Sequence, residues 1–199
     1  MIKHPTREQW LTACSTEILV RFREIFELHF GAEGIEHLRN LHVSTGFPSR
    51  GGLTKVIGEC WASRAAEDEV THHIFINPRL TDIVEVVATL AHEMVHAADD
   101  GEHKHKGPFV KAVREMGLEG KATATVAGAA FADWARGIDA SIGTYPHTGL
   151  VPVMGEKKQS TRMLKLEAEC CGYVARTTKK WIEVGLPSCP CGNEMQEAS

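Results

Sequence analysis

Five consecutive residues, His92-Glu93-Met94-Val95-His96, carry the strongest chemical signal in this 199-residue chain. In a helix, positions i and i+4 lie on one face, so both imidazoles can reach the same metal ion. Histidine nitrogens suit Zn²⁺, and three protein ligands plus one water make an open catalytic site. Glu93 would lie near the metal without binding it, where it can take a proton from the metal-bound water. The spacing therefore predicts a catalytic zinc site.

A third protein ligand must come from the segment downstream of this motif. Glu102, His103 and His105 all lie there, before a short amphipathic pattern that begins near Pro108. His105 lies just before that pattern, on a segment that must turn back after the motif helix. Such a turn could return its imidazole to the metal. Spacing alone leaves Glu102 and His103 as alternatives.

Together these residues resemble the SprT-like metalloprotease family, which includes the Spartan proteases. That family combines H-E-x-x-H with a third histidine in an H-G-x-x-F-type motif that opens the next helix. Here His105-Lys-Gly-Pro-Phe109 keeps the His-to-Phe spacing and shifts the glycine by one position, and Phe75-Ile-Asn-Pro precedes the motif helix. The resemblance implies that His105 is the third ligand and that the fold is a compact, zincin-type α+β domain. It also implies cleavage of proteins, including proteins associated with DNA.

Four of the six cysteines, Cys170, Cys171, Cys189 and Cys191, lie within the last thirty residues. The N-terminus shows no signal-peptide pattern, so this clustering favours a structural zinc over disulfides and a reducing cytoplasm as the compartment. Many members of the resembled family also end in a small zinc ribbon. The spacing is irregular, however, and adjacent cysteines in an extended chain point to opposite sides unless the chain turns tightly. The alternative is a degenerate ribbon without zinc.

The elements that must position the motif can be read from the hydrophobic pattern. The motif helix is expected from about Asp82 to Ala98, with Asp82 as its cap and an apolar arc opposite His92 and His96. A helix over 6–30 and three short strands at 41–46, 56–61 and 71–77 precede it. A helix over 108–116 and a helical segment late in 122–137 follow it. This order predicts an α+β fold with a small three-stranded sheet.

The chain is expected to divide into a metalloprotease domain (1–143), a linker that contains proline and glycine (144–160) and a zinc-ribbon-like β module (161–199). Residues 1–155 carry 15 basic and 20 acidic side chains, and the remainder carries 7 and 6. Neither part has the polybasic character of tight nucleic-acid binders. No apolar run approaches the roughly 18 residues of a membrane span, so no membrane partner is expected.

Two main functions are compatible with these residues. The first is a zinc metallopeptidase that hydrolyses protein or peptide substrates, with His92, His96 and His105 on Zn²⁺ and Glu93 as the base. The alternative is a non-catalytic zinc-binding module that associates with nucleic acid through its C-terminal ribbon. Hydrolysis of a non-peptide bond at the same metal is a third reading.

Two smaller features leave alternatives open. Tyr145 and His147 could reach the cleft and donate to an oxyanion, or they could belong only to a loop. Basic residues near the C-terminal aromatic residues could bind DNA, or they could simply face solvent: Lys157, Lys158, Arg162, Lys165, Arg176, Lys179 and Lys180.

Overall fold

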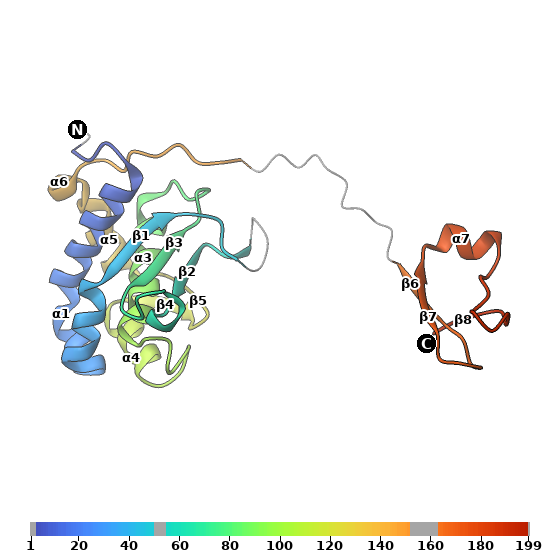
Figure 1. The fold of residues 1–199 in the computed structure, drawn as a ribbon. Coiled ribbons are helices and arrows are strands. Elements are labelled where there is room, and N and C mark those ends of the chain that lie inside the picture. Colours follow the sequence, from blue (N-terminus) through green and yellow to red (C-terminus); the bar gives the residue numbers. More distant parts are fainter. Residues whose placement is uncertain (1–2, 50–54, 152–162, 199) are drawn as a thin grey trace. The chain divides into compact units, whose positions relative to one another are not determined.

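The computed structural model describes residues 3–49, 55–151 and 163–198 (Figure 1). The chain forms two compact units, Met1–Pro152 and Val153–Ser199. Each has its own cluster of buried apolar side chains. Helices and small sheets are mixed, which confirms the predicted α+β class. Among the described residues, no helix combines the length and the apolar character that crossing a bilayer requires.

The first unit begins with the long helix α1 (Arg7–Arg39). Thr6 and Gln9 close its N-terminus with a reciprocal capping box, in which each side chain accepts from the other residue's backbone N–H. Gly31 interrupts the helix with φ 66° and ψ −163°, at the position where the pattern predicted its end. The chain then resumes a helical course to Arg39. The sequence therefore located the break correctly but missed the second segment.

The three predicted strands form one sheet. They are β1 (Leu41–Thr45), β2 (Gly58–Trp61) and β3 (His72–Ile76), in the order β1-β3-β2. β1 runs parallel to β3, and β2 runs antiparallel to it. Ile74 and Ile76 are fully buried on one face, whereas the Phe75 side chain between them is only partly covered. Because the strand order is β1-β3-β2, β2 is an edge strand, and one of its sides is unpaired within the described sheet.

The motif helix is α3 (Ile83–Ala98), and it is the central helix of the unit. The Asp82 side chain caps it by accepting from the Glu85 backbone N–H at 2.9 Å. Every residue from 86 to 95 is buried, because α1 and β2 pack against the helix. An apolar helix that is covered on most sides holds its side chains in fixed positions, which suits residues that must converge on one ion.

The elements after α3 differ in part from the prediction. They are α4 (Pro108–Glu115), the antiparallel hairpin β4 (Leu118–Lys121) and β5 (Ala124–Ala127), α5 (Ala129–Gly137) and α6 (Asp139–Ile142). The hairpin was not predicted, because its strands are short and rich in alanine and glycine, which have weak strand preference. Arg114 on α4 holds the hairpin by donating to the carbonyl oxygens of Leu118 and Gly120.

Residues 144–151, part of the predicted linker, lie along the first unit. The Trp10 indole N–H donates to the Gly143 carbonyl at 2.6 Å, and the Tyr145 ring packs 4.8 Å from the Trp10 ring. A ring nitrogen of His147 bonds to the Pro78 carbonyl at 2.7 Å. The rest of the predicted linker, 152–160, lies outside the described residues.

The second unit is a small sheet with one short helix. Its strands are β6 (Leu164–Glu167), β7 (Val174–Thr177) and β8 (Gln196–Glu197) in the order β7-β6-β8, and its helix is α7 (Lys179–Val184). Among its described residues, four form the buried core: Leu166, Ala168, Cys189 and Met195. The small sheet agrees with the β module predicted over 161–199, whereas the short helix α7 was not predicted.

Candidate metal centre

Three histidines from two segments converge in the first unit. His92 and His96 come from α3, one turn apart, and His105 comes from the loop before α4. Their candidate ligand atoms all lie within 4.8 Å of one another, and the Nε2 atoms of His96 and His105 are 3.1 Å apart. These residues could hold one metal ion.

Phe109 forms the wall behind the three imidazoles. Its side chain is fully buried, and its ring centroid lies 5.1 Å from His92, 4.3 Å from His96 and 5.0 Å from His105. Gly107 precedes it with φ 50° and ψ −120°, a backbone conformation that residues with a Cβ rarely adopt. The glycine lets the chain enter α4 with Phe109 beneath the histidines.

Asp99 forms hydrogen bonds with His103, the alternative candidate for the third ligand. The buried Asp99 carboxylate accepts the His103 backbone N–H at 2.8 Å and pairs with its Nδ1 at 2.6 Å. His103 is thus bound to the start of the loop. Within the described residues, the cluster includes His105 and neither His103 nor Glu102.

Asp100 fixes the other side of the same loop. Its carboxylate accepts the Ser63 backbone N–H at 3.0 Å and bonds to Nε2 of the buried His72 at 2.9 Å. Burial raises the pKa of Asp100, but these hydrogen bonds outweigh burial and leave that pKa lowered. Asp100 also has φ 44°, an unusual value for a non-glycine residue. The loop that carries His105 is therefore anchored to β3 and to the segment after β2.

The surroundings keep the three imidazoles uncharged. Burial lowers the pKa of His92 to about 4, with His105 acting in the same direction. Burial, reinforced by the neighbouring His92 and His105, lowers the pKa of His96 to about 3. Burial also lowers the pKa of His105. Neutral imidazoles have free lone pairs at pH 7, which is the form that binds metals.

Glu93 lies beneath β2, beside the histidines. Its side chain is 7% exposed and accepts a hydrogen bond from the Cys60 backbone N–H. Burial, with a smaller contribution from Glu59, raises the pKa of Glu93 to about 8. Gly58 permits this approach, since a Cβ there would lie 2.7 Å from Oε1 of Glu93.

A cavity of about 340 Å³ is lined by the three clustered histidines and by Glu93. Its walls include Glu59 and Cys60 of β2, Arg64 of the turn after β2, and Thr123 between β4 and β5. Tyr145 and His147 do not line it, so the structure places them in the packing against α1 rather than in the cleft.

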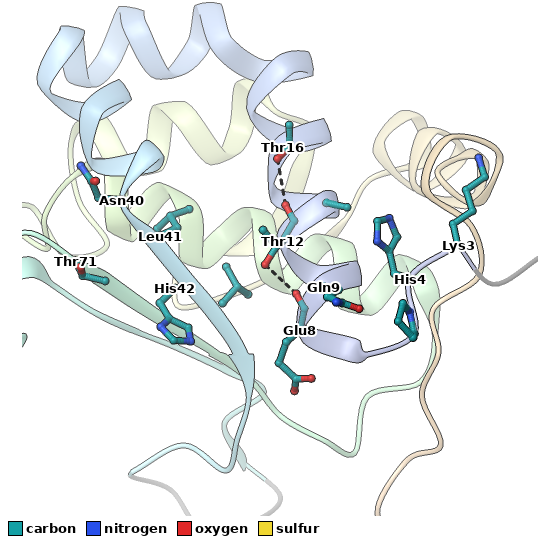
Figure 2. A pocket seen from close by; sticks show the side chains of 13 residues that line it. Lys3, His4, Glu8, Gln9, Thr12, Thr16, Asn40, Leu41, His42 and Thr71 are labelled. Carbon is teal, nitrogen blue, oxygen red and sulfur yellow. Dashed lines mark hydrogen bonds between the residues drawn. The ribbon is translucent and has the colours of Figure 1, made fainter.

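A larger cavity of about 810 Å³ lies elsewhere, between the start of α1 and β1 (Figure 2). Thr12 and Thr16 face it, but their hydroxyls donate to helix carbonyls, as the dashed lines show. The Lys3 ammonium bonds to the carbonyls of Ala140 and Ser141. These three polar side chains thus have partners within the protein, and none of the clustered histidines lines this cavity.

The four C-terminal cysteines also converge, with their sulfur atoms within 4.8 Å of one another. Two tight turns bring them together, and the glycine after each pair has a left-handed φ: 67° at Gly172 and 86° at Gly192. Gly172 N–H donates to the Ala168 carbonyl, which supplies the turn that Cys170 and Cys171 require. Burial raises the pKa of the Cys189 thiol, but hydrogen bonds outweigh burial and lower that pKa to about 7.

Sequence reasoning missed one contact of the centre. Nδ1 of His92 lies 2.9 Å from Oγ1 of Thr125 on β5. The sequence offered no signal for it, because the alternation Ala124-Thr125-Val126-Ala127 would place the apolar Val126 on the covered face, whereas Val126 is exposed and Thr125 is the more covered residue.

No family model, curated protein or solved structure matches this chain. Its chemistry is therefore inferred from its own residues. Three neutral imidazoles, a buried carboxyl with a pKa near neutrality and a shared cavity are suited to metal-assisted hydrolysis.

Proposed function

We propose that this chain is a zinc-dependent metallopeptidase in which His92, His96 and His105 hold the ion. The convergence of three neutral imidazoles beside a buried carboxyl carries the proposal. Two nitrogens at about 2.0–2.1 Å from one tetrahedral Zn²⁺ lie roughly 3.3 Å apart. The 3.1 Å separation of the His96 and His105 Nε2 atoms fits that donor set. Three protein ligands leave a position for water and substrate.

Zn²⁺, when bound, polarises the scissile carbonyl and lowers the pKa of water. Glu93 takes one proton from the attacking water as its oxygen bonds to the carbonyl carbon. Glu93 then gives that proton to the amide nitrogen as the C–N bond breaks, which yields a carboxylic acid and an amine, and the acid loses its remaining proton to the amine or to solvent. The pKa of about 8 belongs to the metal-free site; a bound cation would favour the carboxylate, so that Glu93 can accept the first proton.

The cleft suits an extended polypeptide as the substrate. It borders β2, an edge strand that pairs only with β3 in the described sheet. The Cys60 backbone N–H points toward Glu93, so the unpaired edge of β2 faces the catalytic groups. Main-chain groups of such an edge can pair with an added strand. The resemblance to SprT-like proteases at His92–His96 and His105–Phe109 supports the same substrate class.

The test compares Glu93→Gln with Glu85→Gln, an exposed glutamate on the same helix. Glu93→Gln should lower cleavage of an unfolded protein roughly 10²–10⁴-fold, because the base is lost while the shape is kept. Zinc content, measured by elemental analysis, should match wild type in both variants. Equal cleavage by Glu93→Gln and wild type, or no cleavage by wild type with and without single-stranded DNA, would contradict the proposal.

A weaker second proposal is that the C-terminal unit contacts single-stranded DNA. Tyr173 and Trp181 are exposed, and the Lys180 ammonium lies 5.2 Å from the Trp181 ring. Lys165 and Arg176 face each other across the exposed side of β6 and β7. Lys157, Lys158 and Arg162 lie outside the described residues. This contact could accompany catalysis or, in the non-catalytic reading, replace it.

The comparison of Trp181→Ala with Val184→Ala tests this contact, because both residues are exposed on α7. Base stacking on an aromatic ring is worth about 1–3 kcal/mol, so Trp181→Ala should weaken binding to labelled single-stranded DNA and Val184→Ala should not. Equal binding by all three proteins, measured by fluorescence anisotropy across salt concentrations, would contradict the contact.

A further inference from the structure

We propose that Thr125 is a positioning residue that holds the His92 ring in the orientation needed for metal binding and stabilises the metal-binding tautomer. This inference rests on the proposed zinc site, which it extends beyond the three ligands to the hairpin β4–β5. Thr125 does not belong to the cluster of candidate ligands among the described residues.

The contact decides which nitrogen of His92 faces the ion. Oγ1 of Thr125 lies 2.9 Å from Nδ1 of His92, so Nδ1 is engaged outside the cluster and Nε2 is left for the ion. A neutral imidazole carries its proton on one nitrogen only. When Nδ1–H donates to the threonine oxygen, the lone pair is on Nε2. Because the hydroxyl oxygen can accept as well as donate, it stabilises this tautomer once an ion takes the Nε2 lone pair, and the contact also fixes the ring plane.

The hairpin holds the hydroxyl rigidly at that point. Thr125 and Ala127 are the more covered residues of β5, whereas Ala124 and Val126 are exposed. Thr125 pairs with Gly120 across the hairpin. The Arg114 guanidinium donates to the Gly120 carbonyl from α4, the helix that also carries Phe109. One helix thus supports His92 twice, through the Phe109 ring and through the hairpin that presents Thr125.

The expected effect is on metal affinity. Loss of a hydrogen-bonding partner of a ligating histidine typically lowers metal affinity 10–100-fold. Thr125→Val removes the hydroxyl and keeps the β-branched shape, which suits a strand. Thr125→Ser restores the hydroxyl. Thr45→Val is a matched control, because Thr45 also lies on a strand and donates to a side chain, Glu8, away from the metal centre.

The experiment uses the full-length chain stripped of metal and titrated with Zn²⁺ in competition with a chromogenic chelator at fixed pH. Thr125→Val should raise the zinc dissociation constant of the histidine site 10–100-fold. Thr125→Ser and Thr45→Val should match wild type. Parallel titration with Co²⁺ separates the two clusters, because thiolate ligands give near-ultraviolet charge-transfer bands that imidazole ligands do not.

Each result decides between explanations. Equal zinc affinity of Thr125→Val and wild type would overturn the role of Thr125 and leave the zinc site intact. Weak binding by both Thr125→Val and Thr125→Ser, with lowered thermal stability of the metal-free proteins, would show a merely structural role and would also overturn it. If wild type itself binds no ion at the histidines, the proposed function fails instead.

Discussion

Glu93 and the histidines around it have charge states that differ from those of the same residues in water. The histidines are neutral because burial disfavours their cationic form, and Glu93 retains a proton to a higher pH because burial disfavours its anion. The raised pKa of Glu93 makes the metal-free site less negative, and the lowered pKa values of the histidines make it less positive. A divalent cation would reverse the preference of Glu93, since it attracts the carboxylate.

The raised pKa of Glu93 has a consequence for stability that Glu93→Gln can reveal. Between pH 4.5 and about 8 the folded metal-free chain binds a proton that the unfolded chain releases, so this group's contribution to stability declines as pH rises. Glutamine does not titrate. The unfolding free energy of metal-free Glu93→Gln relative to wild type should therefore grow between pH 5 and pH 8, by at most roughly 1.4 kcal/mol per pH unit. The histidines affect both proteins alike.

Urea unfolding of the two metal-free proteins at pH 5 and pH 8 measures this difference. A gap that is the same at both pH values would mean that the Glu93 carboxyl ionises with an ordinary pKa.

The identity of the third ligand is a second question at this scale. His105→Ala should remove one zinc per chain, because two imidazoles from α3 cannot complete the set. His103→Ala should retain that zinc, since His103 is paired with Asp99 and its side chain is 46% exposed. Elemental analysis after gel filtration gives both values. The opposite pattern, with zinc lost only from His103→Ala, would assign the ligand to His103.

At the scale of elements, β2 packs closely against α3 at Gly58. A Cβ on Gly58 would lie 2.6 Å from Cγ2 of Thr89 and 2.7 Å from Oε1 of Glu93. Gly58→Ala should therefore push the strand away from the helix, cost about 1–3 kcal/mol of stability and lower cleavage activity. Gly137→Ala is the control, because a Cβ there meets nothing within 4 Å at the end of α5.

Thermal unfolding and the cleavage assay, applied to both variants, measure these effects. An unchanged melting temperature and activity in Gly58→Ala would mean that β2 can shift freely, so its edge would not be a fixed wall of the cleft.

The same elements show what the sequence could and could not predict. The 3.6-residue period and the Asp82 cap located α3 to within one residue, and short β-branched runs located the three strands. Those signals are local. The hairpin β4–β5 depends on Arg114 and on packing against α3, which no local pattern records, so Thr125 was missed. The position of His105 beside the other two histidines likewise depends on hydrogen bonds of Asp99 and Asp100, which form only in the folded loop.

At the scale of the whole molecule, the two units make separable predictions. A chain truncated after residue 152 should fold and bind one zinc, since the cluster of His92, His96 and His105 lies within that unit. The full-length chain should bind two, and Cys189→Ser should bind one while retaining peptidase activity. Zinc analysis and circular dichroism of the three proteins measure this. A full-length chain with a single zinc would leave the cysteine cluster as a ribbon without metal.

The anchored loop between α3 and α4 has a further consequence for how the centre is filled. Asp99 and Asp100 hold that loop with hydrogen bonds to the protein's own groups, so the position of His105 is set by the fold. An arriving ion meets three donors that are already in place, and little ordering of the chain accompanies its capture. A chelator should thus empty the histidine centre without unfolding the first unit. The supply of free zinc, rather than refolding, would then set how quickly activity returns.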